Sequence, residues 1–195
     1  MDIAAHLLAN KILEIENLIS AEVVIKLYFE MTEHAVFAQS VYPDAEVQRH
    51  ESISEIAFEN SFSDGSKALL NDFKKDLASM LGIEANQIEP WQCIRYLTGG
   101  NYDYHQDCGE NTSNERLYTV MVTLRSPDFG GAMHFPGISK MVPSKAGSVM
   151  FWRNLDEDYL CDGNMFHAVM PVGNMGMKDE KMILITWVRR YEFVS

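Results

Sequence analysis

The second half of the chain alternates short apolar runs with turn-forming residues. From residue 90 onward, runs rich in β-branched and aromatic residues recur as WQCIRYL, LYTVMVTL, GSVMFW, FHAVMPV and KMILITWV. The segments between them include GGN, SPDFGG, FPG and DGN, which are typical of turns. Short strands with this spacing predict an antiparallel sandwich or a small barrel.

Two stretches of the first half have helical periodicity instead. One follows Ser20, a candidate N-cap, and carries apolar residues at Val24, Leu27, Met31 and Ala35. The other follows Asp64-Gly65 and carries Leu69, Phe73, Leu77 and Met80. Residues 38–63 are polar and irregular, so we expect strand and loop there. The pattern predicts a mainly β (α+β) protein whose helices pack outside the sheet.

Composition and charge narrow the class of protein. With 195 residues, 47% of them hydrophobic, and without repeats or linkers, the chain is expected to form one domain over 1–195. Sixteen basic against 28 acidic residues give a net charge of −12, the opposite of a nucleic-acid binder's basic patch. We therefore expect no nucleic-acid partner.

The cysteines and the first residues bear on the compartment. Three cysteines, Cys93, Cys108 and Cys161, are too few and too odd in number for a disulfide framework, so reduced thiols are expected. The first twenty residues carry acidic side chains where a signal peptide would be basic, and no apolar run reaches the length of a membrane span. These features predict a cytoplasmic protein without a membrane partner.

The segment GGNYDYHQDC, residues 99–108, contains the strongest candidate chemistry. In an extended strand, residues i and i+2 point to the same side, so His105 and Asp107 would converge on one point. A metal ion is the expected occupant, and its third ligand must come from elsewhere in the sheet.

Of the other histidines, His167 is the favoured third ligand. His134 lies between the apolar Met133 and Phe135, so it points away from the core and is either exposed or part of a substrate groove. Surface positions are expected for His6, His34 and His50. Two imidazoles and one carboxylate leave open positions on iron(II), whereas zinc with the same ligands is the alternative that spacing does not exclude.

Six motifs occur in a fixed order along the second half. They are GGNYDYHQD, RLYTVMVTL, FGGAMHFP, VPSKAGSVMFW, HAVMPV and KMILITW. In this order they resemble the prolyl 4-hydroxylase-like branch of the 2-oxoglutarate and iron(II)-dependent dioxygenases. The resemblance covers residue 90 to the C-terminus.

This resemblance implies a fold, an activity and cofactors. The fold would be a double-stranded β-helix (a cupin-like jelly roll) over 90–195, supported by N-terminal helices in 1–89. The cofactors would be Fe(II), 2-oxoglutarate and O2, with ascorbate as an accessory reductant. Iron would bind to His105, Asp107 and His167.

Chelation of iron by the 2-keto and C1 carboxylate groups would bury the C5 carboxylate of 2-oxoglutarate, which then needs a cation. Two lysines are candidates, at 178 − 167 = 11 and 181 − 167 = 14 residues beyond His167. We expect Lys181, because it opens the last strand six residues before Trp187, as the base does in the family, although the family's gap is shorter. Tyr96 and Thr123 match positions that help to hold this carboxylate in relatives.

Tyr102, Arg116 and Trp187 match positions that line the substrate side in the family. The alternatives are sheet packing for Tyr102 and Trp187 and a surface ion pair for Arg116. In a regular strand Tyr102 would face away from His105, so its role requires a bend near the glycines.

The predicted activity is that of an oxidoreductase that hydroxylates prolyl residues of a peptide or protein, giving 4-hydroxyproline, succinate and CO2. Collagen-type relatives carry a histidine two residues after the closing tryptophan, where this chain has Arg189, so a collagen-like substrate is disfavoured. Two alternatives stay open, namely hydroxylation of a free amino acid or other small metabolite, and a non-catalytic metal-binding jelly-roll module.

Overall fold

The computed structural model describes residues 2–39, 54–108, 116–173 and 178–193. His50, which was expected at the surface, lies outside these ranges.

Three helices lie in the first half, as α1 (Ile3–Asn10), α2 (Ala21–His34) and α3 (Asp64–Leu81). The Ser20 hydroxyl accepts the backbone N–H of Val23, which confirms the N-cap predicted for α2. The Ser63 hydroxyl does the same for α3, and Gly82 ends that helix in the left-handed conformation at φ 67°. Helix α1, which no periodicity predicted, begins at an Asp2 cap.

The buried stripe of each helix differs in detail from the predicted one. Val24, Leu27 and Met31 of α2 are buried as expected, whereas Ala35 is the C-cap. In α3 the fully buried stripe is centred one residue away from the predicted one, because Leu70 faces the core and Leu69 and Phe73 pack at its edge. Apolar residues on both edges of a helix make such a shift invisible to periodicity alone.

Eleven named strands in the described residues form two antiparallel sheets. The larger sheet has the order β1-β9-β6-β11-β4-β3-β2 and the smaller the order β5-β10-β7-β8. The larger sheet consists of β1 (Ile12–Glu16), β2 (Ala38–Gln39), β3 (Ser54–Phe58), β4 (Gln92–Leu97), β6 (Arg116–Arg125), β9 (Ser148–Arg153) and β11 (Glu180–Arg189). The smaller consists of β5 (Tyr102–His105), β7 (Met133–Phe135), β8 (Lys140–Val142) and β10 (His167–Val169).

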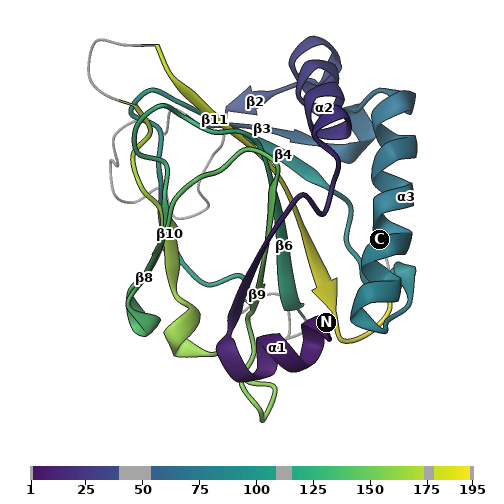
Figure 1. The fold of residues 1–195 in the computed structure, drawn as a ribbon, viewed down its shortest axis with the longest axis vertical. Coiled ribbons are helices and arrows are strands. Elements are labelled where there is room, and N and C mark those ends of the chain that lie inside the picture. Colours follow the sequence, from purple (N-terminus) through teal and green to yellow (C-terminus); the bar gives the residue numbers. More distant parts are fainter. Residues whose placement is uncertain (1, 40–53, 109–115, 174–177, 194–195) are drawn as a thin grey trace.

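The larger sheet divides the core into two layers (Figure 1). Along β11, Met182 and Leu184 join the cluster that packs against the helices, while Ile183 and Ile185 join the cluster between the two sheets. This alternation follows from the two-residue period of a strand. Residues with the parity of Ile183 therefore face the interior of the barrel.

These features confirm the predicted mainly β fold with helices outside the sheet. The predicted strand and loop between residues 38 and 63 are β2, β3 and a short 3-10 helix in the described part. No helix within the described ranges has the length and apolar character needed to cross a membrane.

Candidate active site

His105 and Asp107 lie at the end of β5, the last residue of which is His105. The His105 Nε2 atom is 3.5 Å from Asp107 Oδ1. Their convergence was expected for a continuous strand, but Asp107 lies in the turn that follows it. The turn still brings the carboxylate close to the imidazole.

His167 reaches the same point from the neighbouring strand. It opens β10 and is the direct cross-strand partner of His105. Its Nε2 atom is 3.7 Å from Asp107 Oδ2, and ligand atoms of all three residues lie within 4.8 Å of one another. Among the described residues, this is the group of His, Cys, Asp and Glu side chains that could hold a metal ion.

Backbone carbonyls fix both imidazoles in the form that binds metals. The Nδ1 atom of His105 is 2.8 Å from the carbonyl oxygen of Asp103, and that of His167 is 2.8 Å from the carbonyl oxygen of Met165. A carbonyl only accepts, so Nδ1 carries the proton and Nε2 keeps its lone pair. Both lone pairs are therefore available on the side of Asp107.

Electrostatics favour the charge states that a metal requires. Burial alone would raise the pKa of Asp107, but His167, His105 and the Thr119 hydroxyl hold that pKa well below its usual range. Burial and the nearby His105 lower the pKa of His167, although Asp107 opposes them. At neutral pH the cluster thus holds one carboxylate and a neutral His167, as metal ligation demands.

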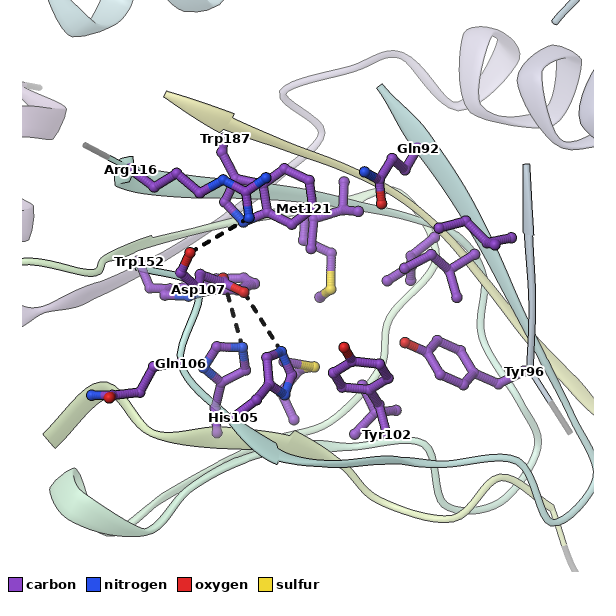
Figure 2. Close-up of a pocket in the computed structure, with 17 residues that line it drawn as sticks. Gln92, Tyr96, Tyr102, His105, Gln106, Asp107, Arg116, Met121, Trp152 and Trp187 are labelled. Atoms are coloured by element: carbon purple, nitrogen blue, oxygen red, sulfur yellow. Dashed lines mark hydrogen bonds and ion pairs between the residues drawn. The ribbon is translucent and has the colours of Figure 1, made fainter. Parts of the chain in front are cut away.

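A cavity of about 270 Å³ opens beside the cluster (Figure 2). Its wall is largely apolar, with Met121, Met133, Trp152, Val169, Ile183 and Ile185. Its polar lining residues other than the cluster are Gln92, Tyr96, Tyr102, Gln106 and Arg116. A mostly apolar pocket with a few convergent polar groups is the usual form of a small-molecule site.

Lys181 is fully buried on β11, with the inward parity of Ile183. Its ammonium group donates to the carbonyl oxygen of Gly131 at 2.7 Å, and no carboxylate of the described residues lies within ion-pair distance of it. Burial lowers the pKa of Lys181 to about 7. Lys178, by contrast, is exposed.

Of the two other residues predicted to contact 2-oxoglutarate, one lines the cavity and the other does not. Tyr96 is the cross-strand partner of Lys181 and lines the cavity. Thr123 is buried on β6 opposite Ile183. Neither Thr123 nor Lys181 lines this cavity, but both are buried on strands of the sheet that borders it.

All three predicted substrate residues line the cavity. A register shift between His167 and Val169 places Tyr102 opposite Val169, so that the Tyr102 ring lies 4.2 Å from the His105 ring, centroid to centroid. This irregularity supplies the bend that Tyr102 required. Tyr104 stays on the outer face, where its hydroxyl hydrogen-bonds to His134, so His134 lies outside the cavity.

Arg116 is held in place by a carboxylate that sequence reasoning did not identify. Glu89 is only 5% exposed and accepts two hydrogen bonds from the Arg116 guanidinium, at 2.8 and 2.7 Å. The guanidinium also lies 3.8 Å from the centroid of the Trp187 ring. Arg189, at the position of the collagen-type histidine, donates to the same Glu89 at 2.7 Å. No local pattern could have suggested this cluster, because Glu89 lies 27 residues before Arg116 and 100 residues before Arg189 in the sequence.

The expectation of three reduced thiols is wrong for two of them. Cys108 and Cys161 form a disulfide across 53 residues of sequence, and Cys93 is the free, buried cysteine. Their separation gave no local signal of pairing. Because Cys108 follows Asp107, the disulfide links the turn that carries Asp107 to the loop 155–161. Reduced thiols therefore no longer support the prediction of a cytoplasmic location.

Reduction of this disulfide is expected to lower the free energy of unfolding by about 2–4 kcal/mol, because the open chain regains loop entropy. Urea unfolding with and without reductant measures the difference. The double variant Cys108→Ser/Cys161→Ser should match the reduced protein and ignore reductant. Equal stability of the reduced and oxidised wild-type protein would contradict the expectation.

The comparisons with known proteins agree with this geometry. The family model described as the 2OG-Fe(II) oxygenase superfamily matches residues 91–189, half of the chain. The chain belongs to the 2OG-Fe(II) oxygenase superfamily. Members of this superfamily use Fe(II), 2-oxoglutarate and O2, and the described residues contain a His-Asp-His triad suited to the iron.

Curated relatives of this oxygenase include animal prolyl 4-hydroxylase subunits. The alpha-3 subunit of Bos taurus is 28% identical over 125 residues, which cover 59% of the chain and 22% of the relative. The alpha-1 subunit of Gallus gallus is 27% identical over 132 residues, which cover 63% and 25% respectively. The chain thus spans a quarter or less of the length of these relatives.

Solved oxygenase structures share the fold. A viral collagen prolyl hydroxylase of Paramecium bursaria Chlorella virus 1, in its 2OG complex, has a TM-score of 0.66 at 22% identity, over 94% of this chain and 97% of that one. A prolyl-4-hydroxylase of Pseudomonas putida has a TM-score of 0.67 at 18% identity, over 97% of both chains. These likenesses confirm the double-stranded β-helix predicted for the core.

Proposed function

We propose that this protein is a 2-oxoglutarate- and Fe(II)-dependent hydroxylase whose iron is held by His105, Asp107 and His167. One observation carries the proposal, namely that ligand atoms of these three side chains lie within 4.8 Å of one another with both Nδ1 atoms bound to carbonyl oxygens. The bound metal, with 2-oxoglutarate and O2, supplies the oxidative chemistry. Iron is favoured over zinc because the family that the chain belongs to uses it.

In this proposal Lys181 neutralises the C5 carboxylate of 2-oxoglutarate, with the hydroxyls of Tyr96 and Thr123 as further donors. A buried ammonium without a carboxylate partner among the described residues has the charge and position for an anionic ligand. The exposure of Lys178 argues against the alternative base. The ligand would extend along the inward face of β11, past Tyr96.

We further propose that the acceptor is a prolyl residue of a peptide or protein, converted to 4-hydroxyproline with release of succinate and CO2. The names of the relatives support this acceptor class. The flat rings of Tyr102 and Trp187 offer apolar contact to a pyrrolidine ring. Arg116, already paired with Glu89, would donate to a neutral peptide carbonyl.

The side chains of the cavity position the reactants and exclude water. Arg116 is rigid because Glu89 and Trp187 hold it on two sides, so it can orient a peptide at the mouth of the cavity. The indole N–H groups of Trp152 and Trp187 are buried without a hydrogen-bond partner in the described structure, and both rings line the cavity. They are available as donors to a bound polar ligand.

The test is anaerobic loading with Fe(II), followed by 2-oxoglutarate, O2 and a proline-rich peptide. We expect peptide-dependent succinate release and a mass gain of one oxygen on a proline. The control is the same peptide with each proline replaced by alanine. Turnover with free proline but not with the peptide would redirect the assignment to a small-molecule acceptor, and no consumption of 2-oxoglutarate with any acceptor would contradict the enzyme assignment.

A further inference from the structure

The Asp107 carboxylate has a buried partner besides the two histidines. The Thr119 hydroxyl donates to Asp107 Oδ2 at 2.5 Å, and Thr119 is fully buried on β6. Thr119 has the parity of Met121, which faces the interior of the barrel. A hydroxyl on a carboxylate is one of the short, strong hydrogen bonds, so this oxygen is firmly engaged.

Asn154 fixes the direction in which this hydroxyl points. Its side-chain Nδ2 donates to Thr119 Oγ1 at 2.9 Å, and Asn154 is 2% exposed. An amide N–H only donates, so the threonine oxygen accepts from Asn154 and its single proton is directed to Asp107. The backbone of Asn154 is itself anchored, since its N–H donates to Leu117 O and its carbonyl accepts from Asp162 N.

The chain Asn154–Thr119–Asp107 leaves the two carboxylate oxygens unequal. Each oxygen faces one imidazole, Oδ1 at 3.5 Å from His105 Nε2 and Oδ2 at 3.7 Å from His167 Nε2, but Oδ2 is the oxygen that also accepts the threonine proton. Two imidazoles and one carboxylate oxygen use three of six positions on an octahedral ion and leave three open. A bidentate cosubstrate and oxygen together need all three open positions. A carboxylate that bound through both oxygens would occupy a fourth position and leave only two.

We propose that Thr119, oriented by Asn154, is a positioning residue that limits Asp107 to metal binding through Oδ1 alone. This inference rests on the proposed function, because it takes Asp107 as a metal ligand. It assigns a role to two buried polar residues that do not line the cavity and that were not among the predicted site residues.

The test uses Co(II) as a redox-inert probe in the whole protein. Thr119→Val removes the hydroxyl at nearly constant volume, and we expect it to raise the Kd for Co(II) by about 10-fold to 100-fold, because the carboxylate loses the hydrogen bond that fixes its orientation for the metal. Thr119→Ser keeps the hydroxyl and should stay within about threefold of the wild type. Thr186→Val is the matched control, because Thr186 is an equally buried threonine in the same barrel whose hydroxyl donates to Glu89 O instead.

Crystal structures of the Co(II)-loaded proteins provide a direct second measurement. We expect one Asp107 oxygen on the metal in the wild type and both oxygens in Thr119→Val. Asn154→Asp should also weaken Co(II) binding, because an aspartate accepts the threonine proton and turns it away from Asp107. This variant keeps the inference testable if Thr119→Val fails to fold.

The outcomes separate this inference from the proposed function. Wild-type protein that binds no Co(II) would overturn both. Wild-type binding with unchanged affinity and one-oxygen coordination in Thr119→Val would overturn the role of Thr119 and leave the ligand set intact. Two-oxygen binding by Asp107 in the wild type would do the same.

Discussion

Replacing Asp107 with alanine will abolish Fe(II) binding and iron-dependent succinate release. The carboxylate is the anionic member of the candidate cluster, and it is almost fully buried between the imidazoles of His105 and His167. Its loss leaves two neutral ligands, so we expect activity to fall by about 10³-fold or more, to the background of uncatalysed oxidation. Equilibrium dialysis with Fe(II) and a succinate assay measure the two effects.

Asp103→Ala is the matched control for this experiment. Asp103 lies on β5, the strand that ends at His105, is exposed and contributes its backbone carbonyl, not its carboxylate, to His105. Removing its side chain should change iron affinity less than about threefold. Retained iron binding and turnover in Asp107→Ala would remove Asp107 from the ligand set.

Replacing Lys181 with methionine will weaken 2-oxoglutarate binding strongly. Methionine fills the buried volume but leaves the C5 carboxylate without a cation, a loss of about 2–5 kcal/mol, or about 30-fold to 4,000-fold in Kd. Lys178→Met removes the same charge from an exposed position three residues earlier and should leave the Kd within about twofold. Calorimetric titration with 2-oxoglutarate compares the variants. A larger increase in Kd for Lys178→Met than for Lys181→Met would assign the C5 carboxylate to Lys178 instead.

The same lysine gives 2-oxoglutarate binding a distinctive pH dependence. Burial lowers the pKa of Lys181 from 10.5 to about 7 in the folded protein, and the carboxylate requires the protonated form. Affinity should therefore be highest below about pH 7 and fall by about tenfold for each pH unit above it. Lys181→Met should lack this slope, and a wild-type profile that is flat between pH 7 and 9 would contradict the assignment.

In the absence of ligand, Lys181 should make the free energy of unfolding increase with pH, whereas 2-oxoglutarate affinity decreases. Between pH 7 and 10.5 the unfolded lysine binds a proton that the folded one has lost, so the unfolded state holds more protons. The contribution of Lys181 to the free energy of unfolding therefore rises with pH across this window. The free energy of unfolding of Lys181→Met minus that of the wild-type protein should therefore decrease as the pH rises across this window.

Local patterns were sufficient for much of the architecture. The apolar run KMILITW predicted the last strand with Lys181 near its start, and Lys181 does lie in β11, on the side of Ile183 and Ile185. The spacing of His105 and Asp107 and the position of His167 predicted three side chains that the structure brings together. These inferences rest on a two-residue period and on motif order, both of which are written in adjacent residues.

Other features depend on pairing between distant segments. The irregular register between β5 and β10 turns Tyr102 into the cavity, against the parity of a regular strand. The disulfide joins cysteines 53 residues apart, and Glu89 meets Arg116 and Arg189 from a segment before β4. No local pattern encodes a register shift or a contact between strands that are far apart in the sequence.

By itself, then, the sequence determined the class of fold, the positions of the main strands and the residues able to bind a metal, because short apolar runs, turn residues and side-chain chemistry are local properties. Only the tertiary structure decided which polar groups share a buried site. The Asn154–Thr119–Asp107 chain illustrates the difference, since each of its members comes from a different part of the barrel. Their partners are set by how the strands pair, and the cost of burying an unpaired polar group keeps them together.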